Sequence, residues 1–360
     1  MRDLRVPKVA AAAVLVLAAT SCSLIGSDES SDAGRDGSGE TTAEDTTVIL
    51  LTHSDFSLPK KVIRGFEQES GYSLEVRPSD GVGTLVNLVT DEAGKPSGDA
   101  VFGVDNTFAS RVEDAGALSP YDGDLPPGAE TFALPGDDGQ RLVPVDTGNV
   151  CVNVDDTWFA ENDLAPPQTL DDLADPAYEG LFVTSSAATS SPGLAFLLTT
   201  IAAYGDDWPD YWQRLLDNDV EIAPSWSEAY YGGFTQGEGD RPIVLSYDSS
   251  PAFTVDEKSE TSSTSALLDT CYRQVEYAGV LEGTENPVGA RELVSYLLGE
   301  QVQSALPESM YVFPVVDGVD LPPDWSRFAQ QPSEPYAVDP AEIEANREDW
   351  LVEWNDLVSR

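Results

Sequence analysis

The sequence predicts an α/β fold arranged in two lobes. Strand-like and helix-like segments alternate along the first half of the folded region, which is typical of a parallel sheet with right-handed crossovers. The chain has 360 residues, and the portion after the polar N-terminal segment is too long for one ordinary hydrophobic core. We therefore expect two α/β lobes.

The alternation begins at residue 47. "TVILLTH" is an apolar strand, and "PKKVIRGFEQESG" carries Val62, Ile63 and Phe66 at helical spacing before a terminal glycine. "YSLEVRPSD" follows as a strand, "TLVNLV" as a helix, "GDAVFGVDN" as a third strand and "TFASRVEDAG" as a helix that ends at Gly116. This order indicates three parallel strands.

Polar residues follow each of these strands. They are His53–Asp55, Asp80 with Gly81, and Asp105 with Asn106. Turn formation alone explains any single cluster, because Asp, Asn and Gly favour turns. Three clusters at the carboxyl ends of parallel strands favour a ligand cleft, since open α/β sheets bind ligands at that edge.

A second α/β region follows and extends to about Cys271. In "TSSPGLAFLLTTIAAYG", Ser190 or Ser191 is suited to the N-cap, Pro192 to the first helical position and Gly205 to the C-cap. The start of such a helix attracts an anion or a hydroxyl group. Helix capping alone also explains the Ser-Pro pair.

The segment "SWSEAYYGGF" gathers aromatic rings in an acidic chain. Ser225 and Glu228 fit a capping box, which makes Trp226 the first helical residue and places Trp226 and Tyr230 on one helix face. "VLSYDSSPAF" then adds Tyr247 and Phe253 where a strand runs into a turn. Packing within a lobe is the alternative interpretation of Trp226 and Tyr230.

The N-terminus has the features of an export signal. A basic start precedes an apolar run from Val9 to Ala19, which is too short to span a membrane. Small residues stand just before Cys22, so we predict a lipoprotein signal peptide over 1–21 and a lipid anchor on Cys22; ordinary secretion is the alternative. Residues 22–47 are polar and acidic, and we predict that they form a flexible tether.

The chain carries 64 acidic and 19 basic residues, for a formal net charge of −45. Nucleic acid is excluded as a partner, because binding to phosphates requires a basic surface. The charge does not identify the ligand.

Cys151 and Cys271 remain once Cys22 is assigned to the anchor. Both lie in strand-like segments, and disulfides persist in an oxidising compartment. We predict a bridge between neighbouring strands; two buried free thiols are the alternative.

Several motifs occur in a fixed order along the chain: "DGVGTLVNLV", "GDAVFGVDN", "TSSPGLAFLL", "AYGDD", "SWSEAYYGGF", "VLSYDSSPAF" and "PAEIEANREDWLVEWNDLVSR". This ordered set resembles the thiamine-binding proteins of bacterial ABC importers, and the resemblance covers the chain from residue 47 to its end. It implies the two-lobed periplasmic-binding-protein fold (class II), with a hinge that lets the lobes close on the ligand. We expect residues 48–146 and 275–360 to form lobe 1 and residues 147–274 to form lobe 2.

The resemblance also implies a ligand and its contacts. The ligand would be thiamine or a thiamine phosphate, delivered to an ABC permease by a monomer that needs no cofactor or metal. Asp80 matches an acidic cleft position, and Gly81 would let the backbone approach the ligand. The remaining matches are a polar helix start, at Ser190 and Ser191, and an aromatic cluster, formed by Trp226, Tyr247 and Phe253.

Three positions differ from the family pattern. His53 stands where a Tyr is common, Phe253 also replaces a Tyr, and Tyr311 stands where a Trp is often found. Ring stacking survives these changes, whereas one hydroxyl contact is lost at Phe253. We expect His53 and Tyr311 to contact the ligand as well.

Two other classes of protein are alternatives. A ferric-ion carrier of the same fold would use Tyr230 and Tyr231 as phenolate ligands, with only His53 to supply an imidazole. A secreted hydrolase would need a catalytic motif, and the chain has no "GxSxG", "HExxH" or "GxxxxGK". We therefore expect a binding protein and not an enzyme.

Overall fold

The computed structural model describes residues 46–137, 140–256 and 260–359. The predicted signal peptide, Cys22 and nearly all of the predicted tether lie outside these residues. Within the described ranges, no helix has both the length and the apolar character needed to cross a bilayer.

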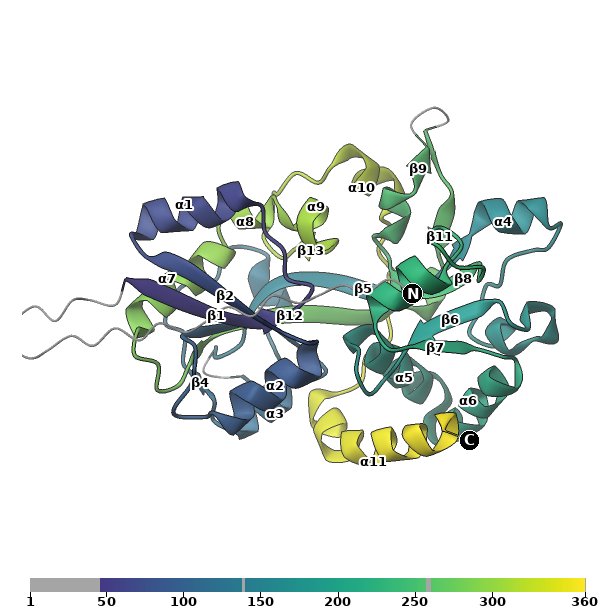
Figure 1. Ribbon diagram of the computed structural model, residues 1–360, viewed down its shortest axis with the longest axis horizontal. Helices are drawn as coiled ribbons and strands as arrows, with labels where there is room; N and C mark the ends of the chain where they lie inside the picture. Colours follow the sequence, from purple (N-terminus) through teal and green to yellow (C-terminus); the bar gives the residue numbers. More distant parts are fainter. Residues whose placement is uncertain (1–45, 138–139, 257–259, 360) are drawn as a thin grey trace, which may run out of the picture. The chain divides into compact units, whose positions relative to one another are not determined.

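A large mixed sheet forms the centre of the folded region (Figure 1). Its strands are β1 (Thr47–His53), β2 (Ser73–Ser79), β3 (Ala100–Asp105), β4 (Leu118–Ser119), β5 (Val143–Asp155), β6 (Phe182–Ser185), β7 (Glu221–Ala223), β8 (Ile243–Tyr247), β11 (Thr264–Ala266), β12 (Tyr272–Leu281) and β13 (Phe313–Pro314). The short strands β9 (Val255–Asp256) and β10 (Thr261–Ser262) pair separately with each other.

Helices cover both faces of this sheet. The α-helices are α1 (Lys60–Ser70), α2 (Val82–Asp91), α3 (Ala109–Asp114), α4 (Asp156–Glu161), α5 (Ser191–Tyr204), α6 (Trp208–Asp217), α7 (Pro287–Leu297), α8 (Glu300–Gln303), α9 (Leu306–Met310), α10 (Pro323–Phe328) and α11 (Pro340–Val358). The 3₁₀ turns are η1 (Ala129–Phe132), η2 (Asp172–Ala174), η3 (Pro176–Tyr178), η4 (Gly205–Asp207), η6 (Ser250–Phe253) and η7 (Leu268–Thr270), and η5 (Glu228–Gly233) is a π-helix.

The predicted alternation of the first half is confirmed. β1 pairs in parallel with β2 on one side and with β3 on the other, and α1, α2 and α3 occupy the predicted helical segments. α1 ends where Gly71 adopts a left-handed conformation with φ 80° and its N–H bonds to the carbonyl of Glu67. A glycine accepts this conformation without a steric penalty.

The sheet is parallel only in part. Its strand order is β2-β1-β3-β12-β5-β8-β6-β7, and β12 pairs antiparallel with both β3 and β5, as does β5 with β8. β5 and β12 are the long strands that connect the two halves of the sheet (Figure 1). The predicted lobe limits, 146/147 and 274/275, fall inside these two strands.

Alternating side chains of the first half pack on opposite faces. Val48 and Leu50 of β1 join Phe66 of α1 and Leu293 of α7 in one apolar cluster, whereas Leu51 joins α2 and α3 in the other. Figure 1 shows α1 and α7 on one side of β1 and β2, with α2 and α3 on the opposite side. The period of two along β1 therefore fixes which helix covers each face.

The second half has its own aromatic core. The ring of Trp212 on α6 packs edge-on against Phe196 of α5 and Trp354 of α11. α11 also contacts the first half, where Glu344 accepts a hydrogen bond from Ser110 of α3. Because α11 contacts helices of both halves, the exact lobe limits stay a prediction.

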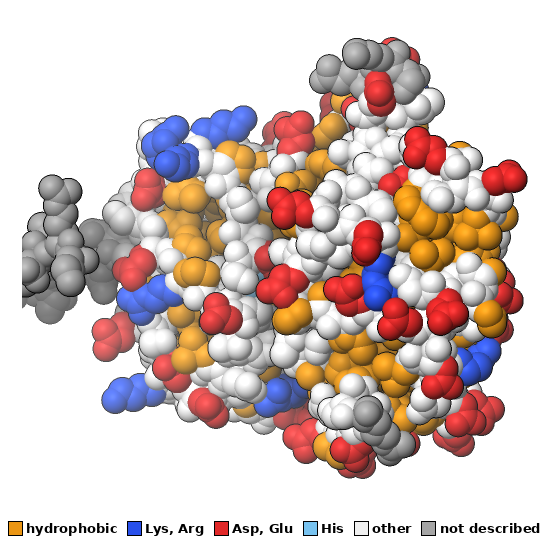
Figure 2. All heavy atoms as spheres, turned by 45° about the vertical axis from the view of Figure 1, so that its right-hand side comes forward, with side chains coloured by type: hydrophobic (Ala, Val, Ile, Leu, Met, Phe, Trp, Pro, Cys, Tyr) orange, Lys and Arg blue, Asp and Glu red, His pale blue; other side chains and the backbone are white. Residues whose placement is uncertain are grey.

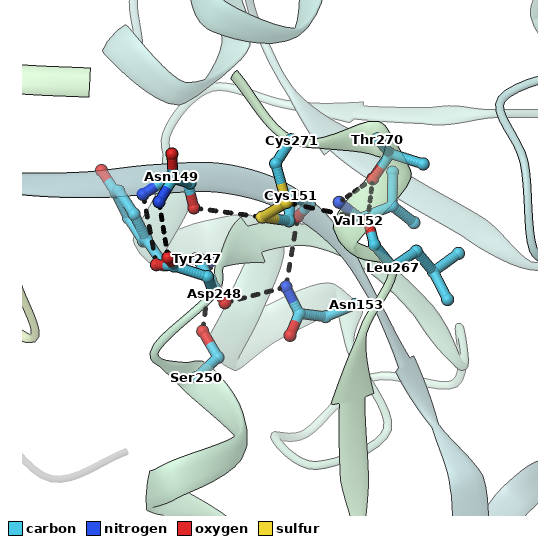
Figure 3. The surroundings of a disulfide bond; sticks show 10 residues. All are labelled: Asn149, Cys151, Val152, Asn153, Tyr247, Asp248, Ser250, Leu267, Thr270 and Cys271. Carbon is cyan, nitrogen blue, oxygen red and sulfur yellow. Dashed lines mark hydrogen bonds between the residues drawn. A yellow bond between two sulfur atoms is a disulfide. The ribbon is translucent and has the colours of Figure 1, made fainter. Parts of the chain in front are cut away.

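A disulfide joins Cys151 of β5 to Cys271, which immediately precedes β12 (Figure 3). The two residues are 120 positions apart in the sequence, and both are fully buried. Tyr272 and Val150 are paired in the ladder beside them, so the bond connects neighbouring strands as the sequence predicted.

Acidic side chains are scattered over the visible surface and do not form one continuous patch, as Figure 2 shows. On the face that Figure 2 shows, the acidic charge is therefore not concentrated at one site.

Candidate functional site

A cavity of about 720 Å³ opens where the two halves of the sheet meet. Its walls come from the ends of β1 and β2, the start of α5, the segment that leads into η5, and the segment Ser309–Val312. Residues of β8 and β12 form its floor. This volume is typical of a site for a small molecule.

The ends of β1 and β2 supply the first wall. His53, Asp55, Asp80 and Gly81 line the cavity, and Asp55 and Asp80 are both solvent-exposed. Gly81 has φ 81°, and a Cβ there would lie 3.3 Å from the carbonyl oxygen of Thr189 on the opposite wall. A glycine is favoured at this point because the two walls approach each other closely.

His53 is buried between the first wall and the floor. Its Nε2 lies 3.2 Å from the carboxylate of Glu276, and its Nδ1 accepts a hydrogen bond from the N–H of Asp55. Burial lowers the pKa of His53, but the attraction of the Glu276 carboxylate and of other nearby acids outweighs it and raises the pKa overall. A side chain at Gly103 would collide with this ring, so Gly103 makes room for His53.

The polar cluster after β3 stabilises the fold instead of lining the cavity. Asp105 is fully buried and accepts hydrogen bonds from the N–H and hydroxyl of Thr107. Asn106 bonds through its side chain to the backbone of Arg273 and Val275 on β12. The expectation that this third cluster faces the ligand is therefore wrong: neither residue is among the described residues that line the cavity, because their side chains bond to Thr107 and to β12.

The two serines before α5 have different partners. Ser190 is the N-cap residue, and Ser191, not Pro192, begins the helix. The Ser190 hydroxyl bonds to the hydroxyl of Ser185 at 3.1 Å, and the Ser191 hydroxyl donates to Asp105 at 2.5 Å. Both serines line the cavity, but the Ser191 hydroxyl is already bonded to Asp105.

The helix start at Trp226 is confirmed. The Ser225 hydroxyl accepts a hydrogen bond from the N–H of Glu228, as in a capping box, and the helix then widens into the π-helix η5. Sequence patterns of the α-helical type do not predict this widening. π-helical turns often occur at functional sites.

Aromatic rings form the second wall. The indole of Trp226 stacks on Tyr230, with ring centroids 5.3 Å apart and an interplanar angle of 25°, and meets Tyr231 and Tyr247 edge-on. Its Nε1 donates to the hydroxyl of Ser246, which holds the ring in place. Among the described residues, the cavity is lined by Trp226, Tyr231 and Tyr247 but not by Tyr230. Tyr230 therefore packs behind Trp226.

Tyr311 lines the cavity at its mouth, and Phe253 stands behind it. Tyr311 is in the left-handed region with φ 64°, and its carbonyl accepts a 2.6 Å hydrogen bond from Ser249. Phe253 packs edge-on against Tyr311 with centroids 4.6 Å apart, and it is not among the described residues that line the cavity. The structure therefore does not bring Phe253 to the cavity wall, because η6 turns its ring toward Tyr311 and Trp325.

The floor contains residues that the sequence patterns did not reveal. Gln274 and Glu276 of β12 line the cavity although both are almost fully buried, and the Tyr247 hydroxyl points to the Gln274 side-chain oxygen at 3.4 Å. One signal was present in the sequence: Glu276 interrupts the apolar run "VEYAGVL". A charged residue within a buried strand is unusual unless it has a specific partner.

A cavity with aromatic and acidic walls, at the junction of the two halves of one sheet, is typical of a solute-binding protein. Residues 99–332 match the model of the bacterial extracellular solute-binding protein family. Two thiamine-binding periplasmic proteins, from Escherichia coli (strain K12) and Brucella suis biovar 1 (strain 1330), are each 31% identical to this chain; the alignments cover 87% and 88% of it and 94% and 93% of the relatives. The chain belongs to the bacterial extracellular solute-binding protein family, together with these thiamine-binding periplasmic proteins.

Solved structures agree with the fold. A periplasmic thiamin-binding protein superimposes with a TM-score of 0.75 at 28% identity, covering 87% of this chain and 96% of that chain. Iron-bound HitA from Pseudomonas aeruginosa superimposes with a TM-score of 0.67 at 20% identity, covering 86% and 99%. The second similarity concerns the fold alone. Both confirm the predicted two-lobed periplasmic-binding-protein fold.

Proposed function

We propose that this protein captures thiamine in the interlobe cavity and delivers it to an ABC permease. The observation that carries the proposal is the aromatic wall: one face of the Trp226 indole is covered by Tyr230, and the residue still lines the cavity. The opposite face is then available to a flat ligand. The names of the relatives support the same ligand.

The chemistry of the cavity suits thiamine. Thiamine combines a cationic thiazolium ring with a flat aminopyrimidine, and a cation over an aromatic face gains about 0.5 to 2 kcal/mol. Asp80 and Asp55 add negative charge to the first wall, and Tyr311 adds another ring at the mouth. Rings and carboxylates together select a flat cation over an anion or a sugar.

Export and anchoring complete the proposal. A chain that carries the lipoprotein signal 1–21 would be held on the outer face of the cytoplasmic membrane by the lipid on Cys22, with residues 22–47 as its tether. The two lobes of a monomer would close on the ligand, with the hinge in β5 and β12. Residues 48–146 and 275–360 would form one lobe, and residues 147–274 the other. No chemical reaction is assigned to the protein.

The ferric alternative has less support. Phenolate ligands must point at one metal ion, but Tyr231 lines the cavity and Tyr230 packs behind Trp226. Burial raises the pKa of Tyr230 to about 12, which disfavours its phenolate form.

Calorimetric titration of the protein tests this function. Thiamine, thiamine monophosphate, thiamine diphosphate and ferric citrate are added separately to the same preparation. Saturable binding of thiamine at one site supports the proposal. Binding of ferric citrate with a visible charge-transfer colour, and none of thiamine, would establish the iron carrier instead.

A further inference from the structure

Buried carboxyl groups lie side by side at the floor of the cavity, where Glu276 of β12 has a ladder partner on each side, Asp146 of β5 and Asp105 of β3. Asp146 of β5 and Glu276 of β12 are partners in the antiparallel ladder, so their side chains leave the same face of the sheet as neighbours. Only 1% of Asp146 and 6% of Glu276 is exposed. Glu276 lines the cavity, so the pair connects the ligand site to the interior of the sheet.

Asp146 lacks an ordinary hydrogen-bond donor. Neither of its carboxylate oxygens receives a hydrogen bond from any part of the chain that the structure describes. Two ionised carboxylates have only acceptor atoms and repel each other, whereas one shared proton lets either group donate to the other. Burial raises the pKa of Asp146 well above its usual range, and the charge of Glu276 raises it further. The geometry of the pair therefore favours a state that holds one proton.

Other titratable groups face the pair from the neighbouring elements. His53, at the end of β1, lies 3.2 Å from Glu276, and the carboxylates of Asp55 and Asp105 act on the same region. Tyr247 of β8 lies within the field of these acids. Among these neighbours, His53 is the group whose ordinary pKa lies closest to neutrality, and it is the competing source of a proton.

We propose that Glu276 is the countercharge for the cationic part of the ligand and that Asp146 is its proton partner, so that binding of the cation expels one proton. This inference rests on the proposed function, because the thiazolium of thiamine supplies the cation. The O–H bond of the carboxyl pair breaks, the proton passes to the buffer, and the cation replaces its positive charge beside Glu276. Asp146 acts through Glu276 and is a positioning residue.

The sign of the pH dependence follows from the released proton. Raising the pH removes the proton that competes with the ligand, so the affinity for thiamine increases with pH. The increase is up to about tenfold per pH unit while the pair is protonated before the ligand binds. At a pH where the pair is already ionised, the affinity becomes constant.

Calorimetry of the full chain with thiamine, in two buffers of different ionisation enthalpy at the same pH, measures the proton directly. The natural protein should release up to about one proton per thiamine bound. Asp146→Asn should release none, because the amide donates to Glu276 without a titratable proton. Glu276→Gln should weaken thiamine binding at least about tenfold and also abolish the release.

Two further variants identify the source of the proton. His53→Gln removes the imidazole and should preserve the release; Asp55→Asn removes one exposed charge from the same cavity and should also preserve it. Two results would overturn the role of the pair and leave thiamine as the ligand. One is thiamine binding without proton release; the other is a release that is lost in His53→Gln but kept in Asp146→Asn. Absence of thiamine binding to the natural protein would overturn both this inference and the proposed function.

Discussion

The hydroxyl of Ser191 donates a 2.5 Å hydrogen bond to the carboxylate of Asp105, and this bond joins the start of α5 to the end of β3. The two elements belong to different predicted lobes, so the contact connects the two halves of the protein beside the cavity. Burial raises the pKa of Asp105, and the hydrogen bond from Ser191 opposes that rise.

Removal of this hydroxyl should destabilise the protein. Ser191→Ala leaves a fully buried carboxylate with one donor fewer, which costs about 1–3 kcal/mol of unfolding free energy. Ser190→Ala is the matched control, because the Ser190 hydroxyl bonds to a neutral hydroxyl and its loss should cost less. Urea unfolding at neutral pH measures both. Equal losses in the two variants would contradict the importance of the bond to Asp105.

The same difference predicts how the site treats phosphorylated ligands. The Ser191 hydroxyl is already bonded to Asp105, and that carboxylate adds negative charge behind the start of α5. The half-buried Ser190 hydroxyl can instead turn away from Ser185 toward a phosphate group. Ser190→Ala should therefore weaken thiamine monophosphate binding more than thiamine binding, by about fivefold. Competition titrations with the two ligands measure the ratio. An unchanged ratio would exclude Ser190 as a phosphate contact.

Trp226 should dominate both affinity and the optical signal. Trp226→Ala removes the stacking face and should weaken thiamine binding at least about tenfold, while Tyr230→Phe keeps a ring behind the indole and should have little effect. The chain has seven tryptophans, so thiamine should quench only part of the fluorescence. In Trp226→Phe the quenching should disappear while binding persists. Full quenching in that variant would assign the signal to another tryptophan.

Local patterns in the sequence predicted the parts of the fold that depend on neighbouring residues. The strands and helices from β1 to α3, the start of α5 and the cap at Ser225 follow from spacing and capping, which act over a few residues. The antiparallel pairing of β5 with β12 joins residues that are more than a hundred positions apart in the sequence, and no local sequence pattern specifies its register. The contact between Asp146 and Glu276 depends on that register and was therefore missed.

The candidate site shows the same limit. Eight of the nine predicted ligand-contact residues line the cavity: His53, Asp80, Gly81, Ser190, Ser191, Trp226, Tyr247 and Tyr311. Phe253 does not, because the direction of its ring depends on how η6 packs against Tyr311 and Trp325. Asp105 was placed correctly at the end of its strand, but its hydrogen bonds to Thr107 and Ser191, which keep it out of the cavity, could not be foreseen.

The disulfide should make a large contribution to stability. Cys151 and Cys271 close a long loop, and removal of such a bond costs about 2–5 kcal/mol. Cys151→Ser together with Cys271→Ser should lower the urea midpoint, and a reducing agent should lower that of the natural protein by a similar amount. Titration of the denatured, unreduced protein with a thiol reagent should find neither cysteine reactive. Two reactive groups there would show that the thiols are free.

The stability of the fold should also depend on pH through Asp248. This fully buried carboxyl accepts hydrogen bonds from the backbone and side chain of Asn149 (Figure 3), yet burial raises its pKa from 3.8 to about 6. Between these two values the folded state holds more protons than the unfolded state, so the unfolding free energy falls as the pH rises through this interval. The slope is up to about 1.4 kcal/mol per pH unit, and the contribution of Asp248 is fully retained below about pH 4.

Urea unfolding of Asp248→Asn at pH 4, 5, 6 and 7 should show a flatter profile than the natural protein, because the amide does not titrate. Identical profiles for the two proteins would mean that other carboxyl groups determine the acid response.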